Sequence, residues 1–289
     1  MKNLQTIRDF LRYAVSQFRL HKLVHGHGTT SVVDEAAFII LESLHLPVDD
    51  INPWLDARLL AHERDTLIDV IAKRISTRKP AAYLLNKIYL QGLPFYVDER
   101  VIIPRSFIAE LMAKGDLQSV MGNANTVSRV LDLCTGSGCL AILAANAFPD
   151  ATVDATDISA DALVVAAQNV HDHGLRDRIH LLQGNLFAPV ATQKYDLIIA
   201  NPPYVAQAEV DAFPPEYQAE PVIAHAGGKD GLDLVRQILR TAKTHLAPGG
   251  TLVCEIGTGQ HLLAEEFDAL NLLWLDTEES EGEVLVFRP

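Results

Sequence analysis

Hydrophobic residues in the first 79 positions recur at helical spacing and predict a small helical bundle. The apolar face of the first helix consists of Ile7, Phe10, Leu11, Ala14 and Phe18. A second helix opens at Asp34-Glu35 and ends near Pro47, and Asn52-Pro53 has the N-cap-then-proline pattern of a third. Thr66 marks the start of a fourth.

The periodicity changes between Lys87 and Pro104. Three short runs rich in β-branched and aromatic residues, at 88–90, 95–97 and 101–103, are divided by Gly92 and by the polar residues 98–100. This pattern predicts a β-hairpin that joins two domains.

From residue 105 onward, apolar strands alternate with helices, beginning with a helix around Ser106–Lys114. Strands are predicted at Val130–Leu133, Thr152–Thr156, Ile179–Gln183, Leu197–Ala200, Thr251–Glu255, Leu272–Leu275 and Val284–Phe287. Helices fill the intervals, notably Gly138–Phe148, Ala160–His173 and Asp230–Leu246. The alternation predicts an α/β, Rossmann-like, doubly wound and mostly parallel seven-stranded sheet whose last two strands form an antiparallel hairpin. The predicted domains are residues 1–86, a linker at 87–104, and residues 105–289.

Composition is that of an ordinary globular enzyme, with 289 residues, 48% hydrophobic and 21% charged. No apolar run of about 18 residues is present, and the N-terminus lacks the apolar core of a signal peptide. The three cysteines have neither zinc-site spacing nor the pattern of a disulfide framework. A cytoplasmic protein without a membrane partner is expected.

The net charge of −13 is unevenly distributed. Residues 1–86 carry 11 Lys/Arg and 10 Asp/Glu, whereas the remainder carries 13 and 27. A nucleic-acid-binding protein normally has a strongly basic face, because phosphate neutralisation dominates its affinity. The acidic second part of the chain instead suits a basic protein substrate.

The first predicted strand of the alternating region leads into a glycine loop, residues 132–141, that reads Asp-Leu-Cys-Thr-Gly-Ser-Gly-Cys-Leu-Ala. Its glycines permit a tight turn and close approach to a ligand at the start of a helix. Asp157, at the end of the next strand, is placed to bind a ribose diol. The spacing of Gly136, Gly138 and Ala141 also satisfies the dinucleotide pattern, so this loop alone leaves a nicotinamide dehydrogenase open.

Asn201-Pro202-Pro203-Tyr204 follows the apolar run 195–200. The prolines end the strand and hold the carbonyls of Asn201 and Pro202 rigidly. An amide, exposed carbonyls and an aromatic ring together suit a planar NH2 group. Taken alone, the motif is equally typical of a strand-terminating turn. The carboxylate of Asp132 before the glycines favours a cationic ligand. S-adenosylmethionine fits both acidic residues, because it carries an ammonium group and a sulfonium for Asp132 and a ribose diol for Asp157.

These motifs resemble those of known enzymes. Asp132–Gly138 with Asp157 resembles the cofactor site of class I methyltransferases, and Asn-Pro-Pro-Tyr resembles the signature of methyltransferases acting on exocyclic or amide nitrogens. The tracts Arg78–Leu84, Gly92–Val101, Pro104–Ser106, His25–Thr29 and Glu220-Pro221 narrow this further. Over essentially its whole length the chain resembles the protein-(glutamine-N5) methyltransferase family, in its branch for large-subunit ribosomal protein uL3.

The resemblance implies methyl transfer from S-adenosyl-L-methionine to a glutamine N5 in uL3, free or in an assembling large subunit, without direct nucleic-acid specificity. It assigns substrate recognition to residues 1–86. The implied cofactor residues are Asp132, Thr135, Gly136, Ser137, Gly138, Asp157, Ile158, Asn185, Leu186, Asn201 and Arg105. The family usually has aspartate where this chain has Asn185, so weaker discrimination at the adenine is expected, with binding retained.

The implied catalytic residues are Asn201, Pro202, Pro203 and Tyr204. The Asn201 side-chain oxygen and the Pro202 carbonyl are each expected to accept one N–H of the glutamine amide. Tyr204 is expected to pack on the amide plane near the sulfonium. Transfer then depends on positioning, without a general base or a metal.

Three alternatives remain at this stage. The sister enzyme that modifies the Gly-Gly-Gln motif of release factors shares these motifs, but it has an acidic residue soon after Pro-Arg-Pro, where this chain has Pro104-Arg105-Ser106. An N6-adenine nucleic-acid methyltransferase would need a basic surface, and a non-catalytic assembly factor would need a damaged site.

Two further features are open to more than one interpretation. The segment 206–229 is long for a connection, which favours substrate capture over a disordered insert. His21, His25 and His27 have no fourth ligand at metal-site spacing, so no metal is expected.

Overall fold

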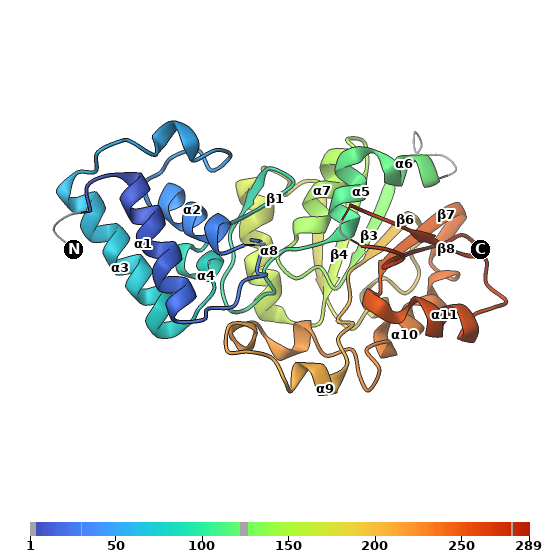
Figure 1. The fold of residues 1–289 in the computed structure, drawn as a ribbon. Coiled ribbons are helices and arrows are strands. Elements are labelled where there is room, and N and C mark those ends of the chain that lie inside the picture. The colour runs from blue at the N-terminus through green and yellow to red at the C-terminus, as the bar shows by residue number, and fades with distance from the viewer. Residues whose placement is uncertain (1–3, 30, 122–126, 279) are drawn as a thin grey trace.

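A seven-stranded sheet and the helices packed on its two faces form the larger part of the molecule (Figure 1). The computed structural model describes residues 4–29, 31–121, 127–278 and 280–289. In these residues the strands are β3 (Arg129–Leu133), β4 (Thr152–Asp157), β5 (Ile179–Gln183), β6 (Tyr195–Ala200), β7 (Leu246–Glu255), β8 (Leu272–Leu275) and β9 (Val284–Phe287). They lie in the order β5-β4-β3-β6-β7-β9-β8. Strands β3 to β7 pair in parallel, whereas β9 is antiparallel to both β7 and β8. The predicted fold class is confirmed.

Alternating side chains of the central strands pack on opposite faces of the sheet, because successive residues of a strand point to opposite sides. In β6, Leu197 and Ile199 join one apolar cluster, and Ile198 and Ala200 join the other. Helices α5 (Phe107–Lys114), α7 (Cys139–Ala147) and α8 (Ala160–Asp172) supply the first cluster. Helices α10 (Asp233–Ala242) and α11 (Gln260–Glu266) supply the second. The short helix α6 (Asp116–Val120) follows α5.

The first part of the chain is helical and lies at one end of the sheet domain (Figure 1). It comprises α1 (Ile7–Leu20), α2 (Val32–Ser43), α3 (Ala61–Thr77) and α4 (Ala81–Leu85), and α1 to α3 enclose a separate apolar core. A capping box between Thr6 and Asp9 starts α1. The four residues Ile7, Phe10, Ala14 and Phe18 are buried, in agreement with the predicted face.

The third predicted helix is wrong. Only a 3-10 turn occurs at Asn52–Trp54, a further turn follows at residues 55–56, and Arg58 then forms an antiparallel bridge with Thr6. The backbone of this stretch pairs with the residues that precede and open α1: Leu59 N–H donates to Gln5 O (2.9 Å), and Ile7 N–H donates to Ala57 O (3.3 Å). This long-range pairing overrides the local N-cap signal. The fourth predicted helix is present, but α3 begins at Ala61, where the Glu63 carboxylate accepts the Leu60 N–H (2.7 Å).

The predicted hairpin is formed by β1 (Ile88–Leu90) and β2 (Leu93–Phe95), which pair antiparallel. Of the predicted run 95–97 only Phe95 lies in β2, and the run 101–103 is not a strand. Val101 N–H closes a turn on Asp98 O (3.1 Å), and Ile103 N–H donates to the Glu220 side chain (2.8 Å). A side chain far along the chain therefore takes the place of a strand partner. The domain boundaries at residues 86 and 104 stay a prediction.

Segment 206–229 folds into short turns between β6 and α10. It contains α9 (Gln207–Val210) and the 3-10 turns Tyr217–Ala219 and Val222–Ala224, and a parallel bridge pairs Val205 with Ala226. In Figure 1 the α9 segment lies along the lower edge of the molecule, below the sheet and its helices. No helix in the described part of the chain is both long and apolar enough to cross a bilayer.

Candidate active site

A cavity of about 290 Å³ opens where β3, β4, β5 and β6 end. Carboxyl ends of parallel strands are the usual ligand site of this architecture. Seven predicted residues lie on its wall: Gly136, Asp157, Ile158, Asn185, Leu186, Asn201 and Pro203. The fold thus brings together residues that are up to 67 positions apart in the sequence.

The glycine loop leaves β3 through left-handed backbone conformations. Cys134, Gly136 and Gly138 have φ of 58°, 55° and 81°. A Cβ at Gly138 would lie 3.2 Å from the Cβ of Ala166 on α8, so glycine permits the close approach of α7 to α8. The loop is therefore shaped both for a turn and for packing beneath it.

Asp157 holds the glycine loop in place at the cavity wall. Its carboxylate accepts the Gly136 N–H (2.9 Å) and the Ser159 N–H (2.9 Å). Ser159 caps α8, so Asp157 also orders the entry to that helix. Burial raises the pKa of Asp157, while the backbone N–H groups favour its carboxylate form. Further lone pairs of this carboxylate are available to a ribose diol.

Three other predicted cofactor residues of this loop, Asp132, Thr135 and Ser137, are buried and do not line the cavity. Asp132 is fully buried and accepts the Thr135 hydroxyl (2.5 Å), and its Oδ1 has no hydrogen-bond partner among the described residues. Burial raises the pKa of Asp132 to about 7. Ser137 is buried, and its carbonyl accepts Asn169 Nδ2 (2.9 Å).

Asn201 is oriented by a backbone contact that sequence reasoning did not find. Its Nδ2 donates to the carbonyl of Arg105 (3.3 Å). This contact leaves Oδ1 as the atom that accepts a further hydrogen bond. Pro202 is buried, and Pro203 joins Asn201 at the cavity wall.

Tyr204 and Arg105 lie off the cavity wall. A Cβ at Gly257 would lie 2.8 Å from the Tyr204 ring, so Tyr204 packs against the turn that follows β7, and burial raises its pKa. The Arg105 guanidinium forms a bidentate pair with Glu220, with both N–O distances 2.8 Å. These two predicted residues therefore do not line the cavity, and their roles toward substrate and cofactor stay predictions.

Known proteins identify the family. The sequence model of the methyltransferase small domain matches residues 117–213. A ribosomal protein uL3 glutamine methyltransferase from Bradyrhizobium diazoefficiens is 58% identical over 286 residues, which cover 97% of this chain and 90% of that protein. The chain belongs to this family. The enzyme of the same name from Bordetella pertussis is 50% identical, over 99% of this chain and 95% of the relative.

Membership of the uL3 glutamine methyltransferase family confirms the predicted resemblance and the assignment as a methyltransferase. The class I methyltransferase family implies the use of S-adenosylmethionine. A solved structure of the hMettl16 catalytic domain with MAT2A 3′UTR hairpin 1 superimposes with a TM-score of 0.54 at 15% identity, covering 96% of this chain and 90% of that chain. This likeness supports the fold.

Part of the cavity wall comes from residues that were not predicted as site residues, although Arg100, Val101 and Pro221 belong to tracts on which the family resemblance rests. Arg100, Val101 and Ile102 precede α5, whereas Pro221 and Ile223 belong to segment 206–229. Ile223 is 56% exposed. Two sequence signals pointed to a part for that segment in the site: its length and the tract Glu220-Pro221.

Two of the three histidines near the N-terminus, His25 and His27, make structural contacts. His25 Nδ1 lies 2.5 Å from Glu35 Oε2, and His27 is buried against Tyr217, with ring centroids 4.2 Å apart. No group of three or more His, Cys, Asp or Glu side chains in the described ranges is arranged to hold a metal.

The buried carboxyl group of Glu255 predicts how the free energy of unfolding depends on pH. This carboxyl is buried at the end of β7, where Ser106 Oγ and Ile108 N–H donate to its Oε1. Burial raises the pKa of Glu255 from 4.5 to about 7, against the opposing effect of these donors. Between those values the folded state holds a proton that the unfolded state has lost, so the free energy of unfolding falls as pH rises.

We expect Glu255→Gln to remove about 1–3 kcal/mol of the stability difference between pH 5 and pH 8. Asp132, whose pKa is also raised to about 7, supplies the remaining slope. Urea unfolding at the two pH values measures this, with Glu265→Gln on the exposed side of α11 as the matched control. If the free energy of unfolding of Glu255→Gln changed between pH 5 and pH 8 as much as that of wild type, the expectation would be contradicted.

Proposed function

We propose that this protein transfers a methyl group from S-adenosylmethionine to the side-chain nitrogen of a glutamine in ribosomal protein uL3. The names of the similar enzymes support the substrate. The single observation that carries the chemistry is the Asn201 side chain, held by the Arg105 carbonyl at the cavity wall with Oδ1 left to accept an N–H.

The residues present fit S-adenosylmethionine. We assign the ribose diol to Asp157, whose carboxylate has further lone pairs, and the adenine to the adjoining part of the wall, which Ile158, Asn185 and Leu186 line. The unpartnered Oδ1 of buried Asp132 suits a cationic group nearby, which would favour the charged form of this carboxyl. When bound, the cofactor supplies a methyl group activated by attachment to a sulfonium.

The chain's own contribution is to orient a weak nucleophile. The lone pair of an amide nitrogen is delocalised into its carbonyl, so the nitrogen must be held in a favourable direction before it reacts. Asn201 Oδ1 and the Pro202 carbonyl are assigned to accept its two N–H groups. Held in this way by Asn201 and Pro202, the amide nitrogen would take over the methyl group that the bound cofactor supplies, and it would then lose one of its two protons to solvent.

Methyl-label transfer tests the proposal. Purified uL3, a peptide release factor and total ribosomal RNA are each incubated with the enzyme and methyl-labelled S-adenosylmethionine. We expect label in uL3, which peptide mass spectrometry assigns to a glutamine side chain. Label found in the release factor alone would overturn the substrate, and label in RNA alone would overturn the protein acceptor.

A further inference from the structure

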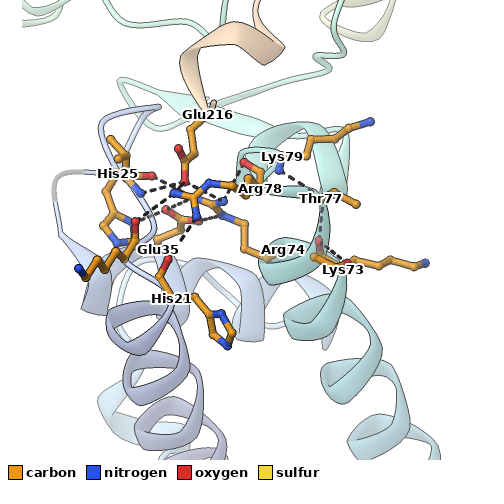
Figure 2. A network of polar contacts seen from close by, with 12 residues as sticks. His21, His25, Glu35, Lys73, Arg74, Thr77, Arg78, Lys79 and Glu216 are labelled. Atoms are coloured by element: carbon orange, nitrogen blue, oxygen red, sulfur yellow. Dashed lines mark hydrogen bonds and ion pairs between the residues drawn. The ribbon is translucent and has the colours of Figure 1, made fainter. Parts of the chain in front are cut away.

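A buried polar network joins the helical part of the chain to segment 206–229 (Figure 2). Its centre is Arg74 on α3, fully buried and paired through Nε with Glu35. Arg74 Nη2 donates to Val24 O (3.0 Å), and Nη1 donates to Arg78 O (2.9 Å). Arg74 therefore fixes three segments of the helical part against one another.

Glu216 enters this network from the other side. Figure 2 shows its side chain directed toward Arg74 and Arg78. Glu216 Oε1 accepts the Val24 N–H (3.0 Å) and lies 2.5 Å from Arg78 Nη2 and 4.0 Å from Arg74 Nη1. The Glu216 side chain is fully buried. A buried carboxylate is held in place by such partners, because leaving it unpaired is costly.

Glu220 lies four residues after Glu216, at the other end of the 3-10 turn Tyr217–Ala219. It connects this turn to the segment that precedes α5, and not to the helical part. Its buried carboxylate binds Arg105 in a bidentate pair and accepts the Ile103 N–H (2.8 Å). The turn itself packs tightly on the helical part: a Cβ at Gly26, where φ is +124°, would lie 2.5 Å from the Tyr217 hydroxyl.

The last step leads to Asn201. The carbonyl of Arg105 accepts Asn201 Nδ2, and the next residue, Ser106, donates through Oγ to Glu255. The backbone that orients Asn201 is therefore fixed by Glu220 through Arg105 and by Glu255 through Ser106. The contacts form an unbroken path from α3 through Glu216 and Glu220 to Asn201.

We propose that Glu216 and Glu220 are positioning residues with separate tasks. Glu220 holds the Arg105 carbonyl that orients the Asn201 amide, and Glu216 holds the helical part of the chain at a fixed offset from that amide. A substrate protein that contacts the helical part is thereby presented with its glutamine in register with Asn201. This inference rests on the proposed function and on the assignment of substrate recognition to residues 1–86.

The two tasks predict different kinetic defects. In Glu220→Gln the new side chain has only one oxygen and cannot accept from both Arg105 nitrogens. We therefore expect kcat to fall about 10- to 100-fold, whether the methyl acceptor is the intact protein or a peptide. In Glu216→Gln we expect kcat/KM for intact uL3 to fall about tenfold through KM, because docking of the large substrate loosens. A short peptide carrying the same glutamine should react within about twofold of wild type in this variant, since it does not reach the helical part.

Two further variants complete the experiment. Arg78→Asn removes the partially exposed partner of Glu216 from a left-handed position that asparagine tolerates, and it should reproduce the defect of Glu216→Gln. Glu209→Gln, exposed on α9 of the same segment, should match wild type. Equal losses on protein and peptide in Glu216→Gln, or a Glu220→Gln defect confined to KM, would overturn the proposal.

Amide hydrogen exchange separates this inference from the proposed function, because it needs no substrate. The Val24 and Ile103 N–H groups donate to Glu216 and Glu220. We expect each amide to exchange at least about tenfold faster in the corresponding Gln variant, with the other amide unchanged. Wild-type exchange rates at both sites in the variants would refute the two connections even if uL3 is methylated, and the expected pattern would support them even if it is not.

Discussion

Asn201→Ala is expected to lower the methyl-transfer rate about 10²- to 10³-fold, while the Kd for S-adenosylmethionine changes by less than about threefold. The variant removes the oxygen assigned to accept a glutamine N–H, so the amide nitrogen loses its direction. The Asp157 and Gly136 contacts that shape the cofactor side of the cavity stay in place. Single-turnover kinetics with uL3 and calorimetric titration of the cofactor measure the two quantities.

Two variants sharpen this test. Asn201→Asp keeps an acceptor oxygen but loses the donor to the Arg105 carbonyl and adds a charge, so it should be nearly as slow as alanine. Asn271→Ala, at an exposed position before β8, should behave as wild type. Near-normal turnover in Asn201→Ala would refute the role of the amide, and a large loss of cofactor affinity would reassign it to cofactor binding.

The sheet could be predicted in detail because its signal is local. Strands buried on both faces are continuous apolar runs, and their ends coincide with glycine, proline or charged residues. The bounds of β5, β8 and β9 agree with the prediction to the residue. The helix predicted after Asn52 was wrong because backbone pairing with Gln5, about 50 positions away, sets the structure of this stretch. A local sequence pattern does not contain such long-range pairing.

In the candidate site, too, local sequence signals predicted some features and long-range contacts determined the others. Asp157 and Asn201 follow strands, and the sequence placed both correctly at the carboxyl edge of the sheet. The resemblance implies a cofactor role for Arg105, which stays a prediction, and the structure pairs its guanidinium with Glu220, 115 positions away. What matters for Asn201 is the backbone carbonyl of Arg105, which carries no signal in residue identity.

Asp157→Ala is expected to weaken S-adenosylmethionine binding about 10²-fold, for two separable reasons. The variant removes the acceptor assigned to the ribose diol, and it leaves the Gly136 N–H of the glycine loop without its partner. Asp157→Asn keeps one acceptor oxygen and the side-chain volume, so it should lose only about tenfold. Asp161→Asn, exposed in the first turn of α8, should bind the cofactor as wild type does.

A cofactor analogue lacking one ribose hydroxyl distinguishes the two reasons. If Asp157 binds the diol, wild type should prefer the intact cofactor over the 2′-deoxy analogue by about tenfold, and Asp157→Asn should lose most of that preference. Calorimetric titration of both ligands into both proteins completes the cycle. An undiminished preference in Asp157→Asn would mean that this carboxylate acts through the glycine loop alone, because a residue that touches the ribose must respond to the missing hydroxyl.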